Sequence, residues 1–468
     1  MTVRDATPFI RRTTWAVLLL YAAACGRETT SPPPSVQVGS AIAVSAKAPA
    51  GPAVSSANPS FGDLGTTIDV QVLGSGFGAD AQATWLLHGV ANGHVHTNST
   101  TFVSSTEVVA NITIDNTAPL DLWDVQISTG GKNGVGSDAF EVTSAQVLSL
   151  QPVVSVEGAN NLGDVVGYTD KDAFIYDDAT GFVDLGPHQA RAADPAATAA
   201  FGADGTGNAI AWMRALDGTW THQFLPAAPN SVGRFATSAA RMADGTLLVA
   251  GVDATGSSRS SNNRPVVWRQ SGSSWSAPTI YAYPPGVTAA FARTVNALGE
   301  VGGQVNASTT GAVWDSPTNP VLVDGLPNAI NSSGTLMVGV KTVGGVTAPA
   351  YWWRDVVTQA WHTTGVLLPT IAGSSCASGG ARAMNDALVV VGTSCNNGGK
   401  DQATVWHLDF SGASPTVVGS PLALSGLHST GTSPISVAAG ISQTAPYVLG
   451  GSAESGGSRL IVRWQLPQ

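Results

Sequence analysis

The chain has 468 residues, a formal net charge of −10 and only 11% charged residues, against about 25% in an ordinary soluble domain. A phosphate backbone would repel so acidic a protein, which argues against nucleic-acid binding. Its 43% hydrophobic residues, 13 tryptophans and 54 glycines favour a turn-rich, β-rich fold and exclude a disordered tail, a coiled coil and a multi-span membrane protein.

Residues 1–24 have the pattern of a secretory signal peptide. Arg4, Arg11 and Arg12 give a positive start, and residues 13–24 form an apolar stretch. A membrane-spanning helix needs about 20 residues, so this stretch is too short to span the bilayer. The sequence therefore predicts an exported protein.

The small residues that end this stretch lead directly into Cys25. Ala22-Ala-Ala-Cys25 resembles the bacterial lipobox, although Ala stands where Leu is usual, three positions before the cysteine. The resemblance implies cleavage before Cys25 and a lipidated, palmitate-bearing N-terminus; an ordinary secreted protein cut after Ala24 is the alternative. Gly26 follows in place of a retaining Asp, which points to the outer membrane or cell surface. Residues 25–50, rich in Ser, Pro and Ala, are expected to form a flexible tether.

Cys376 and Cys395 are the two remaining cysteines. An even pair in an exported chain is expected to form a disulfide. The bond would close a loop of about 20 residues and stabilise the fold by about 3 kcal/mol in the chain-entropy model. No Cys-x-x-Cys motif is present, so a redox role is not expected.

Residues 51–145 are expected to form an immunoglobulin-like β-sandwich. The run Thr67-Ile-Asp-Val-Gln-Val-Leu73 alternates apolar and polar residues, as a half-buried strand does. Four further motifs follow in register: Asn58-Pro-Ser60, Gly74-Ser-Gly-Phe-Gly78, Ala83-Thr-Trp85 and Asp138-Ala-Phe-Glu-Val142. With these motifs the segment resembles an IPT/TIG domain, which implies an accessory spacer or binding module without catalytic residues. His94 and His96 share one side of a strand, but no third ligand is near, so no metal site is assigned.

Residues 146–468 repeat a unit made of an Asn-x-x-Gly turn, a small-residue strand ending in Gly, and a strand ending in an aromatic residue. The closing aromatics are Tyr176, Trp212, Trp268, Trp314, Trp353, Trp406 and Trp464. Their mean spacing of about 48 residues suits the four short strands of a propeller blade. We therefore predict an all-β chain in which a β-propeller follows the sandwich. Seven copies favour seven blades, and the weak second and last copies leave six or eight open.

The repeat also resembles the HAF repeat, a family of extracellular repeats. The match is clearest in Ala329-Ile-Asn-Ser-Ser-Gly334, in Ala383-Met-Asn-Asp386 with Ala403-Thr-Val-Trp406, and in Val183-Asp-Leu-Gly186. The resemblance implies a propeller-like architecture and a surface location, and it brings no catalytic motif.

A search for catalytic chemistry assigns no catalytic residue, no metal ligand and no cofactor. The sequence lacks nucleophile-elbow, zinc-helix, phosphate-loop and calcium-loop motifs. Three aspartates recur at blade turns and could line one face as acid and base, but Asp also favours turns by bonding its own backbone; they are Asp164, Asp244 and Asp386. Three tryptophans near hairpin ends are candidates for stacking on a ligand, namely Trp220, Trp275 and Trp361.

These features favour a monomeric, lipid-anchored surface protein. Its expected role is a non-catalytic binding or scaffold module for envelope glycan or a protein partner, with membrane contact through the lipid anchor. The alternative is a propeller-fold lyase or glycosidase acting on extracellular polysaccharide. An assembly role within an outer-membrane complex is a third hypothesis.

Overall fold

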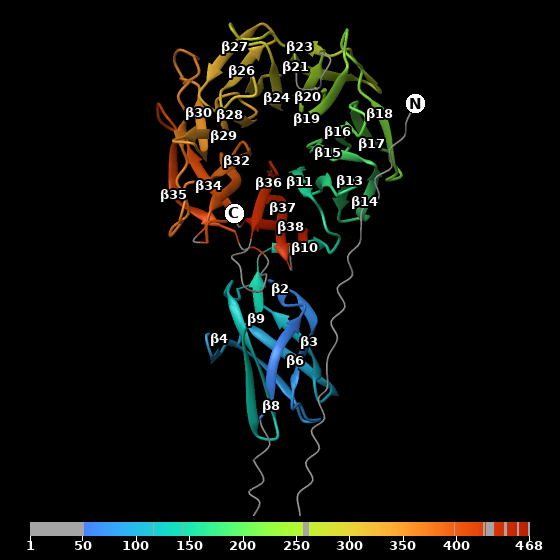
Figure 1. The fold of residues 1–468 in the computed structure, drawn as a ribbon, viewed down its shortest axis with the longest axis vertical. Helices are drawn as coiled ribbons and strands as arrows, with labels where there is room; N and C mark the ends of the chain where they lie inside the picture. The colour runs from blue at the N-terminus through green and yellow to red at the C-terminus, as the bar shows by residue number, and fades with distance from the viewer. Residues whose placement is uncertain are drawn as a thin grey trace, which may run out of the picture. The chain divides into compact units, whose positions relative to one another are not determined.

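The computed structural model describes residues 51–466 apart from 116, 144, 256–261, 397, 425, 427–434, 444–446 and 456–457. All elements in this part of the chain are β-strands, which confirms the all-β prediction (Figure 1). Among these residues no helix is long and apolar enough to cross a membrane. The expected signal peptide, Cys25 and the tether lie outside the described residues.

The first part of the fold consists of two antiparallel-rich sheets with a shared core. One sheet has the order β1-β3-β7-β6, with β1 Ala53–Asn58, β3 Thr67–Ser75, β7 Glu107–Ile114 and β6 Val95–Ser104. The other has the order β2-β9-β8-β4-β5, with β2 Phe61–Asp63, β9 Lys132–Thr143, β8 Leu122–Thr129, β4 Gln82–Leu87 and β5 Val90–Ala91. Every second residue of β7 is buried, and Trp85 meets Phe140 edge-on at 4.7 Å in the core.

From Ala145 onward the described strands form seven further sheets. The first sheet contains β11 Ser155–Ala159, β12 Val165–Tyr168, β13 Ala173–Asp177 and β14 Gly181–Gly186. The second contains β15 His188–Ala193, β16 Ala199–Asp204, β17 Ala209–Arg214 and β18 Trp220–Phe224. The third contains β19 Gly233–Arg241, β20 Leu247–Ala254, β21 Asn263–Ser271, β22 Ser274–Trp275 and β23 Thr279–Ile280. The fourth contains β24 Ala290–Val295, β25 Val301–Val305, β26 Gly311–Ser316 and β27 Asn319–Val323. The fifth contains β28 Leu326–Ile330, β29 Leu336–Val343, β30 Val346–Trp353 and β31 Val366–Leu367. The sixth contains β32 Gly379–Met384, β33 Val389–Cys395, β34 Asp401–Asp409 and β35 Thr416–Ala423. We number these sheets in chain order.

The seventh sheet joins the two ends of this region. It has the order β10-β38-β37-β36, where β36 Ser436–Ile441, β37 Tyr447–Ser455 and β38 Ser458–Leu466 are the last strands and β10 Ala145–Ser149 is the first. β10 pairs antiparallel with β38, so that Ala145 lies opposite Trp464. β11 of the first sheet contacts β36 and β37 of the seventh, and the sheets close into a ring (Figure 1). This ring of sheets confirms the β-propeller prediction.

A buried indole fixes each of the second to sixth sheets against the one before it. In the second to sixth sheets the third strand carries a Trp whose Nε1 donates across the junction: Trp212 to Leu185 O (3.1 Å), Trp268 to Pro226 O (2.8 Å), Trp314 to Ala282 O (2.6 Å), Trp352 to Asp324 Oδ1 (3.0 Å) and Trp406 to Pro369 O (2.8 Å). All five indoles are buried. These five tryptophans are therefore core residues that also satisfy a polar group at each of these junctions.

The fifth closing aromatic is a correction to the sequence prediction. Trp352 pairs with Met337 and is fully buried, whereas Trp353 is half-buried and stacks on His362 with 4.1 Å between ring centres. Adjacent strand residues point to opposite faces, so Trp352 packs against the fourth sheet and Trp353 lies on the face that packs against the sixth.

The disulfide prediction agrees with the structure. Cys376 and Cys395 are bonded, with 5.7 Å between their Cα atoms. Cys395 ends β33, and the bond joins that strand to the loop before β32. The sixth sheet is thus cross-linked where a long connection enters it.

The buried carboxyl of Asp63 on β2 yields a pH prediction. Its Oδ1 is buried without a hydrogen-bond partner among the described residues, and burial raises the pKa of Asp63 to about 7. The pKa of Asp63 is higher in the folded protein than in the unfolded chain. Its contribution to the free energy of unfolding is therefore complete below the unfolded pKa and is lost as pH rises through about 7. We expect Asp63→Asn to be more stable than the parent by about 2 kcal/mol at pH 8 and nearly equal to it at pH 4. Urea unfolding at both pH values measures this; an equal difference at both would contradict it.

Candidate functional site

A β-bulge interrupts one edge strand of each of the seven sheets, namely β11, β15, β19, β24, β28, β32 and β36. In all seven strands the pairing register shifts at one residue, so that a single side chain drops out of the regular alternation. The seven bulge residues are Glu157, Arg191, Thr237, Arg293, Asn328, Arg382 and Ala439. All seven line one central hollow, whose wider part has a volume of 840 Å³. The repeated bulge therefore places one chosen side chain per sheet in the channel.

The channel is positively charged within an acidic protein. Three of the seven bulge residues are arginine and one is glutamate, so their formal charge is +2, against −10 for the whole chain. Arg241, Asp386 and Asp401 also line the hollow, and with them its four arginines and three carboxylates sum to +1. Burial lowers the pKa of Arg293, and the nearby charge of Arg382 lowers it further, while Glu157 opposes the shift. Arginine stays protonated in proteins, so the arrangement keeps like charges close together. An anion in the channel would relieve that repulsion.

Neighbouring side chains position two of the arginines. Arg293 Nε donates to Asn328 Oδ1 at 2.9 Å, and Asn328 Nδ2 donates to Ala381 O at 2.8 Å on the next sheet. The guanidinium of Arg191 lies 5.4 Å from the ring centre of Phe235. Arg191 Nη2 also donates to Gln189 Oε1 at 2.8 Å, and both arginines line the hollow.

The third arginine and the glutamate are not held in this way. Within the described part of the chain, Arg382 and Glu157 make no hydrogen bond and no ion pair. Both side chains line the channel, and that of Arg382 is exposed there. Arg382 is thus the channel arginine with most hydrogen-bonding capacity to offer a ligand.

Sequence reasoning missed these residues, although a signal was present. Ala190-Arg-Ala192, Ala292-Arg-Thr294 and Ala381-Arg-Ala383 share an Ala-Arg-small pattern at the same place in three repeats. The segment reads as a small-residue strand in each repeat. In a regular strand, whose side chains alternate between two faces, the arginine would point into a sheet-to-sheet contact. The bulge is the feature that makes the pattern a channel position.

Of the three turn aspartates only Asp386 lines the channel hollow, so they do not gather there as acid and base. Asp164 is buried, accepts a bond from Asn160 Nδ2 at 2.9 Å, and has its pKa raised by burial. Asp244 is exposed and accepts from Thr246 N at 2.9 Å, and hydrogen bonds from Thr246 lower its pKa. Asp386 accepts from Ser332 N and Oγ at 2.8 and 2.6 Å. Each carboxylate satisfies turn backbone or a neighbouring turn.

Trp220 and Trp275 are half-buried and lie against the core of the ring. Trp220 packs beside Arg214, with 5.8 Å from the guanidinium carbon to the ring centre, and Trp275 meets Phe201 edge-on at 5.8 Å. Their Nε1 atoms are buried, without a partner among the described residues. One side of each indole ring therefore packs against the protein and is closed to a ligand.

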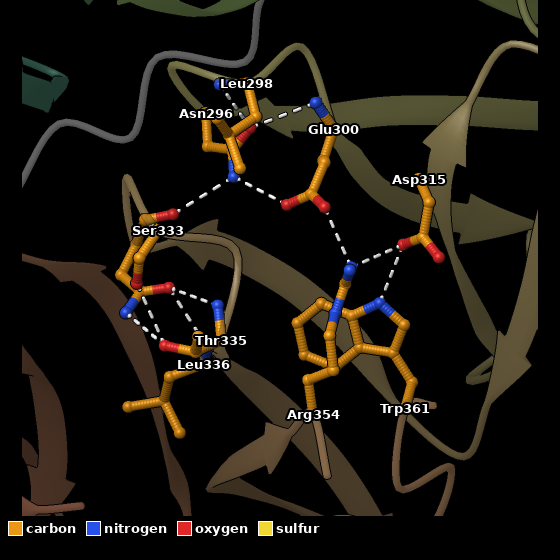
Figure 2. Close-up of polar contacts among 10 residues, drawn as sticks. Asn296, Leu298, Glu300, Asp315, Ser333, Thr335, Leu336, Arg354 and Trp361 are labelled. Carbon is orange, nitrogen blue, oxygen red and sulfur yellow. Dashed lines mark hydrogen bonds and ion pairs between the residues drawn. The ribbon is translucent and has the colours of Figure 1, made fainter. Parts of the chain in front are cut away.

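Trp361 lies in a polar cluster at the junction of the fourth and fifth sheets. Its side chain is buried, its Nε1 donates to Asp315 Oδ1 at 2.8 Å, and Arg354 covers its ring at 4.7 Å. Figure 2 shows Arg354 between two carboxylates, Glu300 at 2.8 Å and Asp315 at 2.6 Å. This position leaves Trp361 no free face on which a ligand could stack.

The same junction explains the Asn-x-x-Gly turn. Asn296 Oδ1 accepts from Leu298 N and Glu300 N at 3.0 Å, and Asn296 Nδ2 donates to Glu300 Oε2 at 2.7 Å (Figure 2). Burial raises the pKa of Glu300, while Arg354 opposes that shift. The turn thus presents a buried carboxylate to an arginine of the next sheet.

His94 and His96 both face Asp115. Their ring nitrogens lie 3.3 Å from its two carboxylate oxygens. No group of three or more His, Cys, Asp or Glu side chains suited to a metal ion occurs among the described residues.

Comparison with known proteins gives no family. No family model matches the chain, and no curated protein matches it. Among solved structures, a streptogramin B lyase is 10% identical with a TM-score of 0.35, covering 69% of this chain and 96% of that one. Virginiamycin B lyase from Staphylococcus aureus is 9% identical with a TM-score of 0.30, covering 83% of this chain and 100% of that one. At these values the likeness carries no argument about activity.

We expect Arg354→Met to destabilise the protein by about 3–5 kcal/mol at pH 7, because it leaves Glu300 buried and unpaired. The loss should shrink near pH 4, where Glu300, whose pKa is already raised, becomes neutral. Urea unfolding at both pH values gives the comparison. Arg354→Lys is the matched control, since it keeps the charge and should lose less; a loss independent of pH would count against the buried pair.

Proposed function

We propose that the protein is an exported, lipid-anchored binding module whose propeller channel takes an anionic ligand. The observation that carries the proposal is the +2 charge that the bulge residues place in a channel of an otherwise acidic protein. Arginine forks pair well with carboxylates, and a channel with low-dielectric walls strengthens the attraction.

In this proposal each part of the chain has a separate task. Cys25 carries the lipid, residues 25–50 are the tether, and the two-sheet segment is an IPT/TIG-like, immunoglobulin-like spacer. The seven sheets are the seven blades of the propeller, closed by β10, and they present the channel. The outer membrane or cell surface is the proposed location.

An acidic envelope polysaccharide is the ligand class that fits best. An exported protein meets such polymers, and their uronate groups supply the carboxylates that the arginines lack. An acidic protein partner is the weaker alternative, because the charge lies inside a channel and not on a broad face. For a lyase or glycosidase, Glu157, Asp386 and Asp401 line the hollow, but Asp386 is engaged by Ser332, whereas glycoside hydrolysis commonly uses a pair of carboxylates that face the substrate.

Removing channel charge should weaken binding of oligogalacturonate. For full-length protein carrying Arg293→Gln or Arg382→Gln, we expect about 10–100-fold lower affinity by calorimetry, since hydrogen bonds to charged groups contribute about 1.5–3 kcal/mol each. Binding should also weaken as salt is raised.

Arg269→Gln is the matched control, because it removes the same charge from an exposed side chain that lines neither part of the channel. Equal affinity for parent, channel variants and control would refute the channel as the site. Unsaturated products or new reducing ends during the titration would favour the lyase or glycosidase.

The lipid anchor has its own test. In a double-membrane bacterium grown with labelled palmitate, the parent protein should carry the label and fractionate with membranes. Cys25→Ser should abolish both, because a thioether needs the cysteine sulfur. A labelled Cys25→Ser protein, or an unlabelled parent, would exclude this anchor.

A further inference from the structure

A second pocket opens beside the channel, among the first three sheets. It has a volume of 430 Å³, within the range of small-molecule sites. The inference drawn from it rests on the proposed channel function and extends it.

Three residues that line this pocket carry buried polar atoms with no hydrogen-bond partner in the described part of the chain. They are His188 Nδ1, Arg191 Nε, and both Nδ2 and Oδ1 of Asn263. Asn263 is fully buried, so both ends of its amide are removed from bulk water. Unpartnered buried groups are rare in native proteins, and three on one pocket wall mark a place built for a polar ligand.

The pocket is also positively charged. Lys171, Arg191 and Arg234 line it together with one acidic residue, Asp204. The Asp204 carboxylate is already engaged by Asn208 and Thr206; their hydrogen bonds outweigh the effect of burial and lower its pKa. Asp204 therefore remains an anion satisfied within its own turn, and the lysine and arginines are left to face an anionic ligand.

The pocket and the channel share part of their walls. Arg191, Phe235 and Val252 line both hollows. Arg191 is a bulge residue, so one guanidinium can contact groups on either side of this shared wall. One ligand could extend from the channel into the side pocket past Arg191.

We propose that the side pocket is a second subsite for the same acidic polysaccharide, holding the uronate unit next to the one in the channel. The hydroxyls of a sugar both donate and accept, which matches the donor and acceptor ends of the Asn263 amide. Its carboxylate matches Lys171 and Arg234. The two subsites together bind at least two adjacent charged units of one polysaccharide chain.

The test compares galacturonic acid with its dimer and trimer by calorimetry on full-length protein. The parent should bind the trimer at least about tenfold more tightly than the monomer, since linked units bind with a high effective concentration. In Lys171→Gln/Arg234→Gln this gain should fall to about twofold, with the affinity for the monomer unchanged. Arg269→Gln should keep the full gain.

Several outcomes would overturn the second subsite. These are a trimer that binds no more tightly than the monomer, a gain that survives in the double variant, or triglutamate binding as tightly as trigalacturonate. If the double variant unfolds below the parent, Lys171→Gln alone replaces it, because that side chain is exposed.

The same titrations separate the two proposals. Monomer binding that depends on Arg382, without a gain for the trimer, would leave the channel function standing and remove the subsite. No binding of any galacturonate would remove both. Neutral galactotriose should bind neither hollow.

Discussion

The packing of each sheet on the one before it is the constraint on which this structure depends. A four-stranded sheet has two faces to cover, and here each face is covered by a neighbour, so no sheet would be stable alone. The closing tryptophans contribute large apolar surface to these junctions, and their indole N–H groups also satisfy a carbonyl or carboxylate of the preceding sheet. Register between sheets is thus fixed by a directional bond inside an apolar contact.

Charged groups also bridge these junctions. Arg241 pairs with Asp194 of the preceding sheet at 2.6 Å. Arg354 likewise pairs with two carboxylates of the sheet before it, Glu300 and Asp315. Asp194 and Glu300 belong to turns and Asp315 to β26, so each of these segments must be correctly placed together with the next sheet. Such buried pairs add little net stability when intact and a large loss when one partner is removed.

Close packing at the junctions leaves the centre of the ring for other uses. Strands that converge on an axis must place small residues there, and the alanines and glycines flanking each bulge do so. The bulge then turns a single side chain inward without disturbing the pairing on either side. Because that position is free of packing demands, its identity differs from sheet to sheet, and arginine occurs in three of the seven.

Much of the architecture was predictable from local pattern. Strand alternation, the turn motif and the spaced aromatic residues predicted an all-β propeller with tryptophans mainly in the core, and the even cysteine pair predicted the disulfide. The second sheet was harder to find, because Asp194 replaces the turn asparagine and bonds Thr198 N and Oγ1 in its place. The lipid anchor and the IPT/TIG resemblance remain predictions.

Local sequence pattern was enough to predict the strands, the repeat and the residues available to the core, because these depend on side chains within a few positions of one another. The strand that closes the ring was visible in the folded chain alone, since β10 and β38 lie more than 300 residues apart. The folded chain also shows that Trp361 is covered by Arg354 and that Glu157, Arg191, Arg293 and Arg382 meet around one axis. Those contacts join residues from different repeats, and no pattern within one repeat specifies which of its side chains will face another.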